Sequence, residues 1–269
     1  MFCTVFSQGF PLPPCSVYNQ NMIRGWDGSI NDIAETDLAV LPVGSIEQHG
    51  PHLSAATDWI IADALGRGIA EKTGGFFIPA LPISTNREHR GKKGSVGMHS
   101  DTFYRMMTDI CLDLKTQGFR RIAIVQGHGG IFVMNPIVRE LNADHNPDLF
   151  VVKIDMMEIC WPVFEKLGIL ESRGGIHADE AETSMILHLH PELADMSKAL
   201  DFMPAQGRPM LNYSGMLRFC PDGVWGAASK ATAEKGRQML AIAAEESVKW
   251  MNGIFDMMSQ KLPLNGSWF

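Results

Sequence analysis

The chain has 269 residues, of which 45% are hydrophobic, and it carries a formal net charge of −7. This length allows a large buried core, and an acidic balance without a long Lys/Arg cluster argues against a nucleic-acid partner. No apolar run approaches the roughly 18 residues of a membrane span, and the N-terminal twenty residues lack the basic and apolar regions of a targeting signal. We therefore expect a cytoplasmic protein without a membrane partner.

The cysteines are odd in number and scattered, with no CxxC pair of the kind found in zinc knuckles and redox motifs. This pattern predicts reduced thiols, as is usual in the cytosol. The five positions are Cys3, Cys15, Cys111, Cys160 and Cys220.

Short apolar runs alternate with helical patterns from residue 38 onward, which predicts a three-layer α/β/α fold around a mostly parallel sheet. Strands are expected at residues 38–43, 76–83, 121–126 and 149–154. Helices are expected at residues 58–72, 101–117, 133–143, 156–167, 180–190 and 231–258. A Gly/Pro-rich passage at 204–226 has no regular pattern. Because no repeat or low-complexity linker divides the chain, we expect one domain over residues 1–269.

The stretch LPVGSIEQHGPHLSAATDW, residues 41–59, holds several side chains of the metal-ligand type. Glu47 and His49 follow the first predicted strand, and Asp58 begins the first predicted helix. His128, within GHGG, follows the strand at 121–126. Because ligands of open α/β sheets gather at the carboxyl ends of the strands, we expect these four side chains to converge. Their nitrogen and oxygen atoms suit zinc, manganese or iron.

Two of these residues, taken alone, also have a purely structural interpretation. Asp58 alone is equally consistent with a helix N-cap, and His128 alone with a turn residue between glycines. The two carboxylates and two histidines together favour a divalent metal site.

A third motif is GGIHADEAETSMILHLHP, residues 174–191. Here His177 is expected just before the N-terminus of a helix. Glu180 and Glu182 are two residues apart and cannot share one helical face, so one should point inward and the other outward. Both glutamates are also typical of a helix N-terminus, where they favour the helix dipole.

In order and separation, PVGSIEQHGPHLSAATD, GHGG and HADEAETS resemble the motifs of the creatininase (creatinine amidohydrolase) family, over residues 38–193. The resemblance implies an α/β hydrolase with two divalent metal ions, assembled as a homo-oligomer, commonly a hexamer. It implies Glu47, His49, Asp58 and His128 as metal ligands, with Asp58 bridging the ions. It implies His177 as the residue that transfers a proton to the leaving group.

Creatininase supplies a further glutamate two residues after the histidine of its GHYE motif, where this chain has Gly130. Family members with GHGG retain the glutamate of the ETS motif, so the resemblance implies Glu182 as the remaining carboxylate ligand. The loop STNREHRGKKGSVGMHS resembles the active-site loop of the family, which implies that Glu88 and His89 contact substrate. A solvated basic loop explains its arginines and lysines equally well.

Two departures argue against creatinine itself as the substrate. The tryptophan that creatininase places shortly before the histidine of the third motif is absent from SRGGIH, and the usual asparagine after GHGG is Ile131. We therefore expect a metal-dependent hydrolase of a small polar cyclic substrate, which attacks an amide or related C–N bond through a metal-activated water. The alternatives are C–C hydrolysis of a cyclic diketone, such as an oxidised inositol, and a non-catalytic metal-stabilised binding protein.

Overall fold

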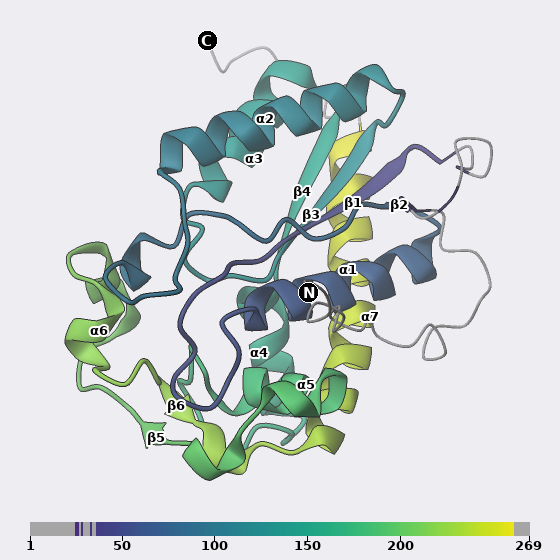
Figure 1. Cartoon of the computed structure of the whole chain (residues 1–269). Helices are drawn as coiled ribbons and strands as arrows, with labels where there is room; N and C mark the ends of the chain where they lie inside the picture. The colour runs from purple at the N-terminus through teal and green to yellow at the C-terminus, as the bar shows by residue number, and fades with distance from the viewer. Residues whose placement is uncertain (1–24, 27, 29–32, 34–35, 261–269) are drawn as a thin grey trace, which may run out of the picture.

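Parallel strands form the central sheet of the computed structural model, which describes residues 25, 26, 28, 33 and 36–260 (Figure 1). The strands are β1 Leu38–Val43, β2 Phe76–Phe77, β3 Arg121–Gln126 and β4 Phe150–Asp155. Their order in space is β2, β1, β3, β4. Val43 pairs with Gln126, which pairs with Asp155, so β1, β3 and β4 end at one edge of the sheet.

Helices cover both faces of this sheet, which confirms the expected three-layer arrangement (Figure 1). The α-helices of the described part of the chain are α1 Thr57–Thr73, α2 Ser100–Thr116, α3 Met134–His145, α4 Met156–Lys166, α5 Glu180–Leu189, α6 Met216–Phe219 and α7 Ala233–Ser259, of which α6 lies apart from the sheet. Successive strand residues point to opposite faces. Val40 therefore packs in the core formed with α1 and α7, whereas Leu41 packs in the core formed with α2 and α3.

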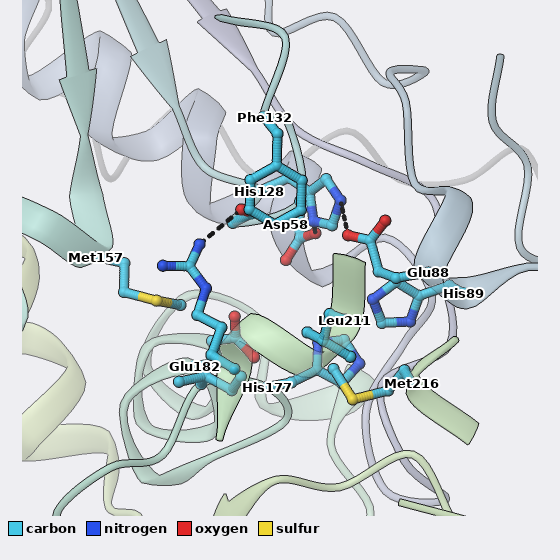
Figure 2. A pocket seen from close by; sticks show the side chains of 14 residues that line it. Asp58, Glu88, His89, His128, Phe132, Met157, His177, Glu182, Leu211 and Met216 are labelled. Atoms are coloured by element: carbon cyan, nitrogen blue, oxygen red, sulfur yellow. Dashed lines mark hydrogen bonds and ion pairs between the residues drawn. The ribbon is translucent and has the colours of Figure 1, made fainter. Parts of the chain in front are cut away.

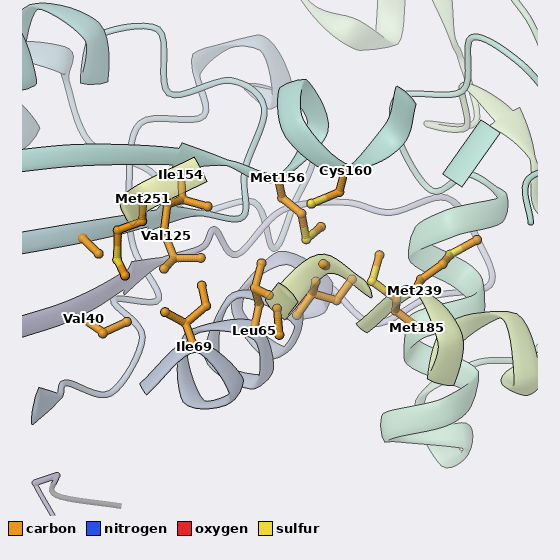
Figure 3. Packing of buried hydrophobic residues seen from close by; sticks show 14 of the residues in the cluster. Val40, Leu65, Ile69, Val125, Ile154, Met156, Cys160, Met185, Met239 and Met251 are labelled. Atoms are coloured by element: carbon orange, nitrogen blue, oxygen red, sulfur yellow. The ribbon is translucent and has the colours of Figure 1, made fainter. Parts of the chain in front are cut away.

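The core on the α1 side is built from aliphatic side chains of three strands and from methionines. Figure 3 shows Leu65 and Ile69 of α1 beside Val125 of β3, with Met251 of α7 closing the layer. Burying one such side chain contributes about 1.5–3 kcal/mol. This layer holds α1 firmly against the sheet, and α1 carries one of the predicted metal ligands in its first turn.

Two glycines let the strand ends lie directly against α1. A Cβ atom at Gly44, just after β1, would lie 2.4 Å from the Cα atom of Trp59. A Cβ atom at Gly127, just after β3, would lie 2.7 Å from the Cβ atom of Ala62. Because only glycine fits at either position, the loops after β1 and β3 can approach the start of α1.

Between α5 and α7 the chain is irregular. It contains short 3-10 helices, α6, and a small antiparallel pair made of β5 (Asp201–Phe202) and β6 (Gly226–Ala227), which Figure 1 shows grouped apart from the sheet. A separate hydrophobic cluster holds this part together, with Met216, Cys220 and Trp225 at its centre. We call residues 208–219, which include α6, the cover segment.

The sequence prediction and the structure differ most at the second strand. A strand was expected over residues 76–83, but regular pairing covers only Phe76–Phe77. Pro79 and Pro82 lack the N–H group that a ladder needs. The segment still runs beside β1, because the N–H of Leu81 donates to the carbonyl of Pro42 at 2.9 Å.

Some expectations lie partly or wholly outside the described residues. Cys111, Cys160 and Cys220 are buried free thiols, whereas Cys3 and Cys15 are not described. The N-terminal segment that lacks a targeting pattern is not described either. None of the described helices is long and apolar enough to cross a membrane.

Candidate metal centre

Side chains from separate parts of the chain meet where β1 and β3 end. Glu47 and His49 lie in the loop after β1, Asp58 in the first turn of α1, His128 in the loop after β3, and Glu182 in the first turn of α5. Each is at most 6% exposed. Figure 2 shows Asp58, His128 and Glu182 in one pocket. The fold thus brings together all five side chains that were expected as metal ligands.

Asp58 lies between two histidines. Its Oδ1 atom is 3.0 Å from Nε2 of His49, and its Oδ2 atom is 3.0 Å from Nδ1 of His128. Each oxygen of one carboxylate therefore faces a different imidazole, which is the geometry that a carboxylate shared by two cations needs. The N-cap residue of α1 is Ala56, and the Asp58 side chain makes no capping bond, so the N-cap interpretation is wrong.

Candidate ligand atoms cluster within 4.8 Å of one another in three groups among the described residues. The groups are Glu47 with Asp58 and His128, His49 with His177 and Glu182, and Glu47 with His89 and His177. Nitrogen and carboxylate oxygen atoms at this spacing are typical of divalent metal sites.

Several of the carboxylate oxygens have no hydrogen-bond donor although they are buried. Both oxygens of Glu47 and Oδ2 of Asp58 make no hydrogen bond of acceptable geometry. Imidazole nitrogens of His89 and His128 lie 3.0 and 3.3 Å from Oε1 of Glu47, but their orientation is unsuitable. A buried carboxylate without donors is costly, and a bound cation removes that cost. The residues present therefore fit a divalent metal.

The pKa values of the carboxylates point to the same need for positive charge. Burial raises the pKa of Glu47 well above its usual range, and repulsion from Asp58 adds to the shift although His128 opposes it. Burial likewise raises the pKa of Glu182. For Asp58, burial is outweighed by His49 and His128, which hold its pKa well below the usual range.

The histidines divide into two kinds. Burial lowers the pKa of His49, but attraction to Asp58 outweighs it and raises the pKa to about 9. For His177, burial and the neighbouring His49 lower the pKa well below its usual range. Both causes disfavour the charged imidazolium, so they favour the neutral form of the His177 ring.

The two glutamates of α5 point in different directions. Oε2 of Glu182 accepts a hydrogen bond from the N–H of Ala178 and lies 3.6 Å from Nε2 of His49. Glu180 instead pairs with Nζ of Lys235 at 2.6 Å and accepts from the hydroxyl of Ser172. Of the two, Glu182 is the one that faces the histidines.

His177 lies just before α5 but does not cap it. The N-cap is Asp179, whose carboxylate accepts from two N–H groups of the first turn. Nε2 of His177 donates to the carbonyl of Gln48 at 2.7 Å, since a carbonyl can only accept, and this leaves Nδ1 as the acceptor of the ring. Ala178, with a φ of 47°, holds the turn between His177 and the helix in a conformation unusual for a non-glycine residue.

Glu88 fills the space beside Gly130. Its Oε1 atom is 3.2 Å from Nε2 of His128, an ion-pair distance without the geometry of a hydrogen bond, and a Cβ atom at Gly130 would lie only 1.5 Å from that oxygen. The position where creatininase has a glutamate is thus a glycine, and a carboxylate from another loop occupies the adjacent space. A carboxylate on the outer nitrogen of a metal-binding histidine fixes the orientation of the ring.

His89 is buried beside the ligand cluster. Its Nε2 atom is 3.0 Å from Oε1 of Glu47, and its Nδ1 atom is 3.0 Å from the side-chain nitrogen of Gln48. The basic residues of the same loop are exposed, in agreement with a solvated surface; they are Arg87, Arg90, Lys92 and Lys93.

A pocket opens onto this cluster, with both Glu88 and His89 in its wall. The space between and above its walls is about 360 Å³, open solvent included, and the room for water-sized molecules is about 20 Å³. Figure 2 shows Phe132, Met157, Leu211 and Met216 around it, so the wall that faces the cluster is largely apolar.

Two residues of the site did not emerge from the sequence. The side-chain nitrogen of Gln48 lies 3.0 Å from Nδ1 of His89 and its backbone carbonyl accepts from His177, and its place between Glu47 and His49 was the available signal. Arg208 lines the pocket from the cover segment, where the absence of periodicity left no signal.

A parallel α/β fold with buried histidines and carboxylates at its strand ends defines a metal-hydrolase type of site. The sequence model of the creatininase family, described as creatinine amidohydrolase, matches residues 26–251, and the chain belongs to this family. Membership makes it a hydrolase.

Relatives in the family have different activities. A mycofactocin precursor peptide peptidase of Mycobacterium ulcerans is 28% identical over 82% of this chain and 88% of its own. A creatinine amidohydrolase of Pseudomonas putida is 25% identical, with 84% and 90% covered. A 3-dehydro-scyllo-inosose hydrolase of Thermotoga maritima is 26% identical, with 93% and 88% covered.

Solved structures share the fold. A putative creatinine amidohydrolase from Bacteroides fragilis, 28% identical, has a TM-score of 0.66 with 85% of this chain and 92% of that chain covered. A Zn–Zn form of a creatininase variant and a Mn form of creatininase, 24% and 22% identical, have TM-scores of 0.67 and 0.66, each with 83% and 91% covered.

Proposed function

We propose that this chain is a metal-dependent hydrolase that cleaves an amide or related C–N bond of a small cyclic substrate through a metal-activated water. The observation that carries the proposal is Asp58, whose two oxygens face two different histidines while buried carboxylate oxygens beside it lack hydrogen-bond donors. A protein that used this cluster only for folding would satisfy those oxygens with its own N–H or O–H groups.

Two divalent ions, zinc, manganese or iron, are assigned to the cluster. Glu47 and His128 would hold one ion and His49 and Glu182 the other, with Asp58 shared between them. The support is the spacing of the ligand atoms, together with the zinc and manganese forms of creatininase structures of the same fold. When bound, such ions polarise water and a substrate carbonyl, so that water can attack near neutral pH.

His177 is assigned the proton transfer. As a neutral imidazole it can take a proton from the attacking water at Nδ1, which is 3.7 Å from Oε1 of Glu47, and pass it to the leaving nitrogen. Its Nε2–H is held by the Gln48 carbonyl, so the ring keeps one orientation. General acid–base catalysis of this kind contributes about 10² to 10⁴ in rate.

Relatives support a C–N bond. The peptidase and the amidohydrolase both cleave such bonds by name. The second candidate is C–C hydrolysis of a cyclic diketone, which the inosose hydrolase favours because the same activated water can attack a ketone. The third alternative is a metal-stabilised binding protein without turnover.

We also propose a single-domain cytoplasmic homo-oligomer, a hexamer by resemblance to the family. Light scattering of the purified full chain tests the hexamer directly, and a monomeric mass would reject it.

The deciding experiment loads the full chain with zinc, manganese or iron(II) and assays each form on matched panels of cyclic amides and cyclic diketones. Release of ammonia or amine, lost on chelation and restored by metal, is the expected result. A ring-opened carbon product without amine would favour the diketone reaction. Ligand binding without turnover in any metal form would favour the binding protein.

A further inference from the structure

Arg208 lies in the pocket wall facing the proposed metal site. It begins the 3-10 helix Arg208–Asn212 of the cover segment and is half-buried. One of its terminal nitrogens donates to the carbonyl of Gly129 at 2.8 Å, and the guanidinium carbon is 5.8 Å from the centre of the Phe132 ring. These contacts hold the guanidinium next to the loop that carries His128.

The charge of Arg208 has no carboxylate partner among the described residues. No described carboxylate lies within 4.0 Å of its guanidinium, although Glu88, Glu182 and Asp58 line the same pocket. Arg208 is also the one Lys or Arg in the pocket lining of the described chain. A guanidinium has five N–H donors, and the contact with Gly129 uses one of them.

When the charges of the proposed metal site are summed, the positive charge of Arg208 has no counter-charge. The cluster has four carboxylates, Glu47, Asp58, Glu88 and Glu182, and two divalent ions would neutralise them. Arg208 then contributes an unmatched positive charge beside an apolar wall, where water screens charge less than in bulk. An anionic group of a ligand would balance this charge.

We infer that the substrate carries a carboxylate next to the bond that is cleaved, and that Arg208 binds this carboxylate. The inference rests on the proposed hydrolase function and deepens it by naming the substrate class, an amide or lactam with a neighbouring carboxylate. A carboxylate matches the planar fork of a guanidinium and is a monoanion, which balances one arginine. A phosphate dianion would need a second cation, and the described pocket lining offers none besides the histidines.

The test measures binding to the zinc-loaded full chain by calorimetry with matched probes. The pairs are 5-oxoproline with 5-oxoprolinamide, and N-acetylglycine with N-acetylglycinamide, which differ only in a carboxylate against a neutral amide. The wild-type chain should bind the acid of each pair about 10- to 150-fold more tightly. Arg208→Gln should remove this preference, and Arg208→Lys should keep part of it, because lysine retains the charge but not the fork.

Arg218→Gln is the matched control, since Arg218 lies in the same segment but is exposed and outside the pocket lining. It should keep the full preference. Zinc content and thermal midpoint, measured on every variant, should be unchanged in Arg208→Gln. A preference that survives in Arg208→Gln would show that the zinc alone attracts the acids and would overturn the inference. So would wild-type protein that binds neither acid at millimolar concentration.

Inorganic phosphate, titrated in the same way, tests whether Arg208 prefers a carboxylate to a phosphate. Arg208-dependent binding of phosphate more tightly than of either acid would reject a carboxylate as the group recognised. Failure of the inference is separable from failure of the hydrolase function. Turnover of neutral amides that Arg208→Gln leaves intact would reject the inference alone, whereas Arg208-dependent acid binding without hydrolysis in any metal form would reject the hydrolase function alone.

Discussion

The floor and the cover of the pocket are built in opposite ways. The floor consists of buried histidines and carboxylates fixed at strand ends and helix starts, in close contact with the sheet. The cover segment, residues 208–219, is irregular and partly exposed, and its side chains pack in a small cluster of their own around Met216. From this difference we expect the buried residues of the floor to perform the chemistry and the cover segment to select the substrate. Substitutions in the floor should therefore affect metal binding and turnover for every substrate.

The largest effect is expected from Asp58→Ala. Because the two oxygens of Asp58 face different histidines, its loss should remove a ligand from both ions at once. Metal content per chain after desalting should fall to near zero, and activity with it. Asp63→Ala is the control, since Asp63 lies on the same helix but bonds to the N–H of Ala80. Retention of two metals by Asp58→Ala would contradict the bridging assignment.

The next effect separates chemistry from metal binding. His177→Asn should lower kcat by about 10² to 10⁴, because a proton carrier is lost, while metal content and thermal midpoint stay close to wild type. The control is Asp179→Ala, which removes the true N-cap of α5 and should cost about 0.5–2 kcal/mol of stability. Loss of metal from His177→Asn would instead make His177 a ligand, as its place beside His49 and Glu182 would allow.

A paired substitution on α5 tests which glutamate belongs to the floor. Glu182→Gln should lose one metal ion, because Glu182 faces His49. Glu180→Gln should keep both ions and lose about 1–3 kcal/mol of stability, since it breaks the bond to Lys235. Metal content and chemical denaturation of both variants provide the measurement. Full metal in Glu182→Gln, with one ion lost from Glu180→Gln, would reverse the assignment.

The stability that Glu180 contributes should also depend on pH. Burial raises the pKa of this carboxyl, but Lys235 and Ser172 outweigh it and lower the pKa below its ordinary 4.5. A group with a lowered pKa in the folded state stabilises fully above its ordinary pKa, and this stabilisation disappears as the pH falls through the folded-state pKa. The stability difference between wild type and Glu180→Gln should therefore shrink in acid.

The floor was largely predictable from the sequence because its residues follow the ends of regular strands or lie at the starts of helices. The apolar runs at 38–43 and 121–126 match β1 and β3, and the parallel-sheet rule then indicated that Glu47 and His128 would meet. The roles of these side chains stay predictions. The strand expected at residues 76–83 was too long. Pro79 and Pro82 interrupt it, because an extended apolar run does not guarantee a hydrogen-bond ladder.

The cover was not predictable in the same way. Arg208 follows a glycine and precedes a proline in a segment without hydrophobic period, so nothing in the sequence indicates which strand end it approaches. The sequence also did not indicate that Glu88 lies beside Gly130. A glycine in GHGG shows that a side chain is missing, but only the folded chain shows that a carboxylate 42 positions earlier uses the space.

The smallest effect is expected from Gly130→Ala, and it tests whether Gly130 leaves the space that Glu88 uses. A Cβ atom at Gly130 would lie 1.5 Å from Oε1 of Glu88 and 2.5 Å from Nε2 of His128. In Gly130→Ala the flexible carboxylate of Glu88 has to move away from His128, and the His128 ring itself has to shift. Loss of such a supporting carboxylate typically weakens metal binding by about 10- to 100-fold, and Glu88→Gln should weaken it by a similar factor. Zinc affinity, measured by competition with a chromophoric chelator, gives both values without any substrate. The decisive variant combines the two changes: if both act by removing one carboxylate from His128, the double variant should bind zinc about as weakly as either single one. Multiplied losses would mean that Gly130 and Glu88 support the metal site independently.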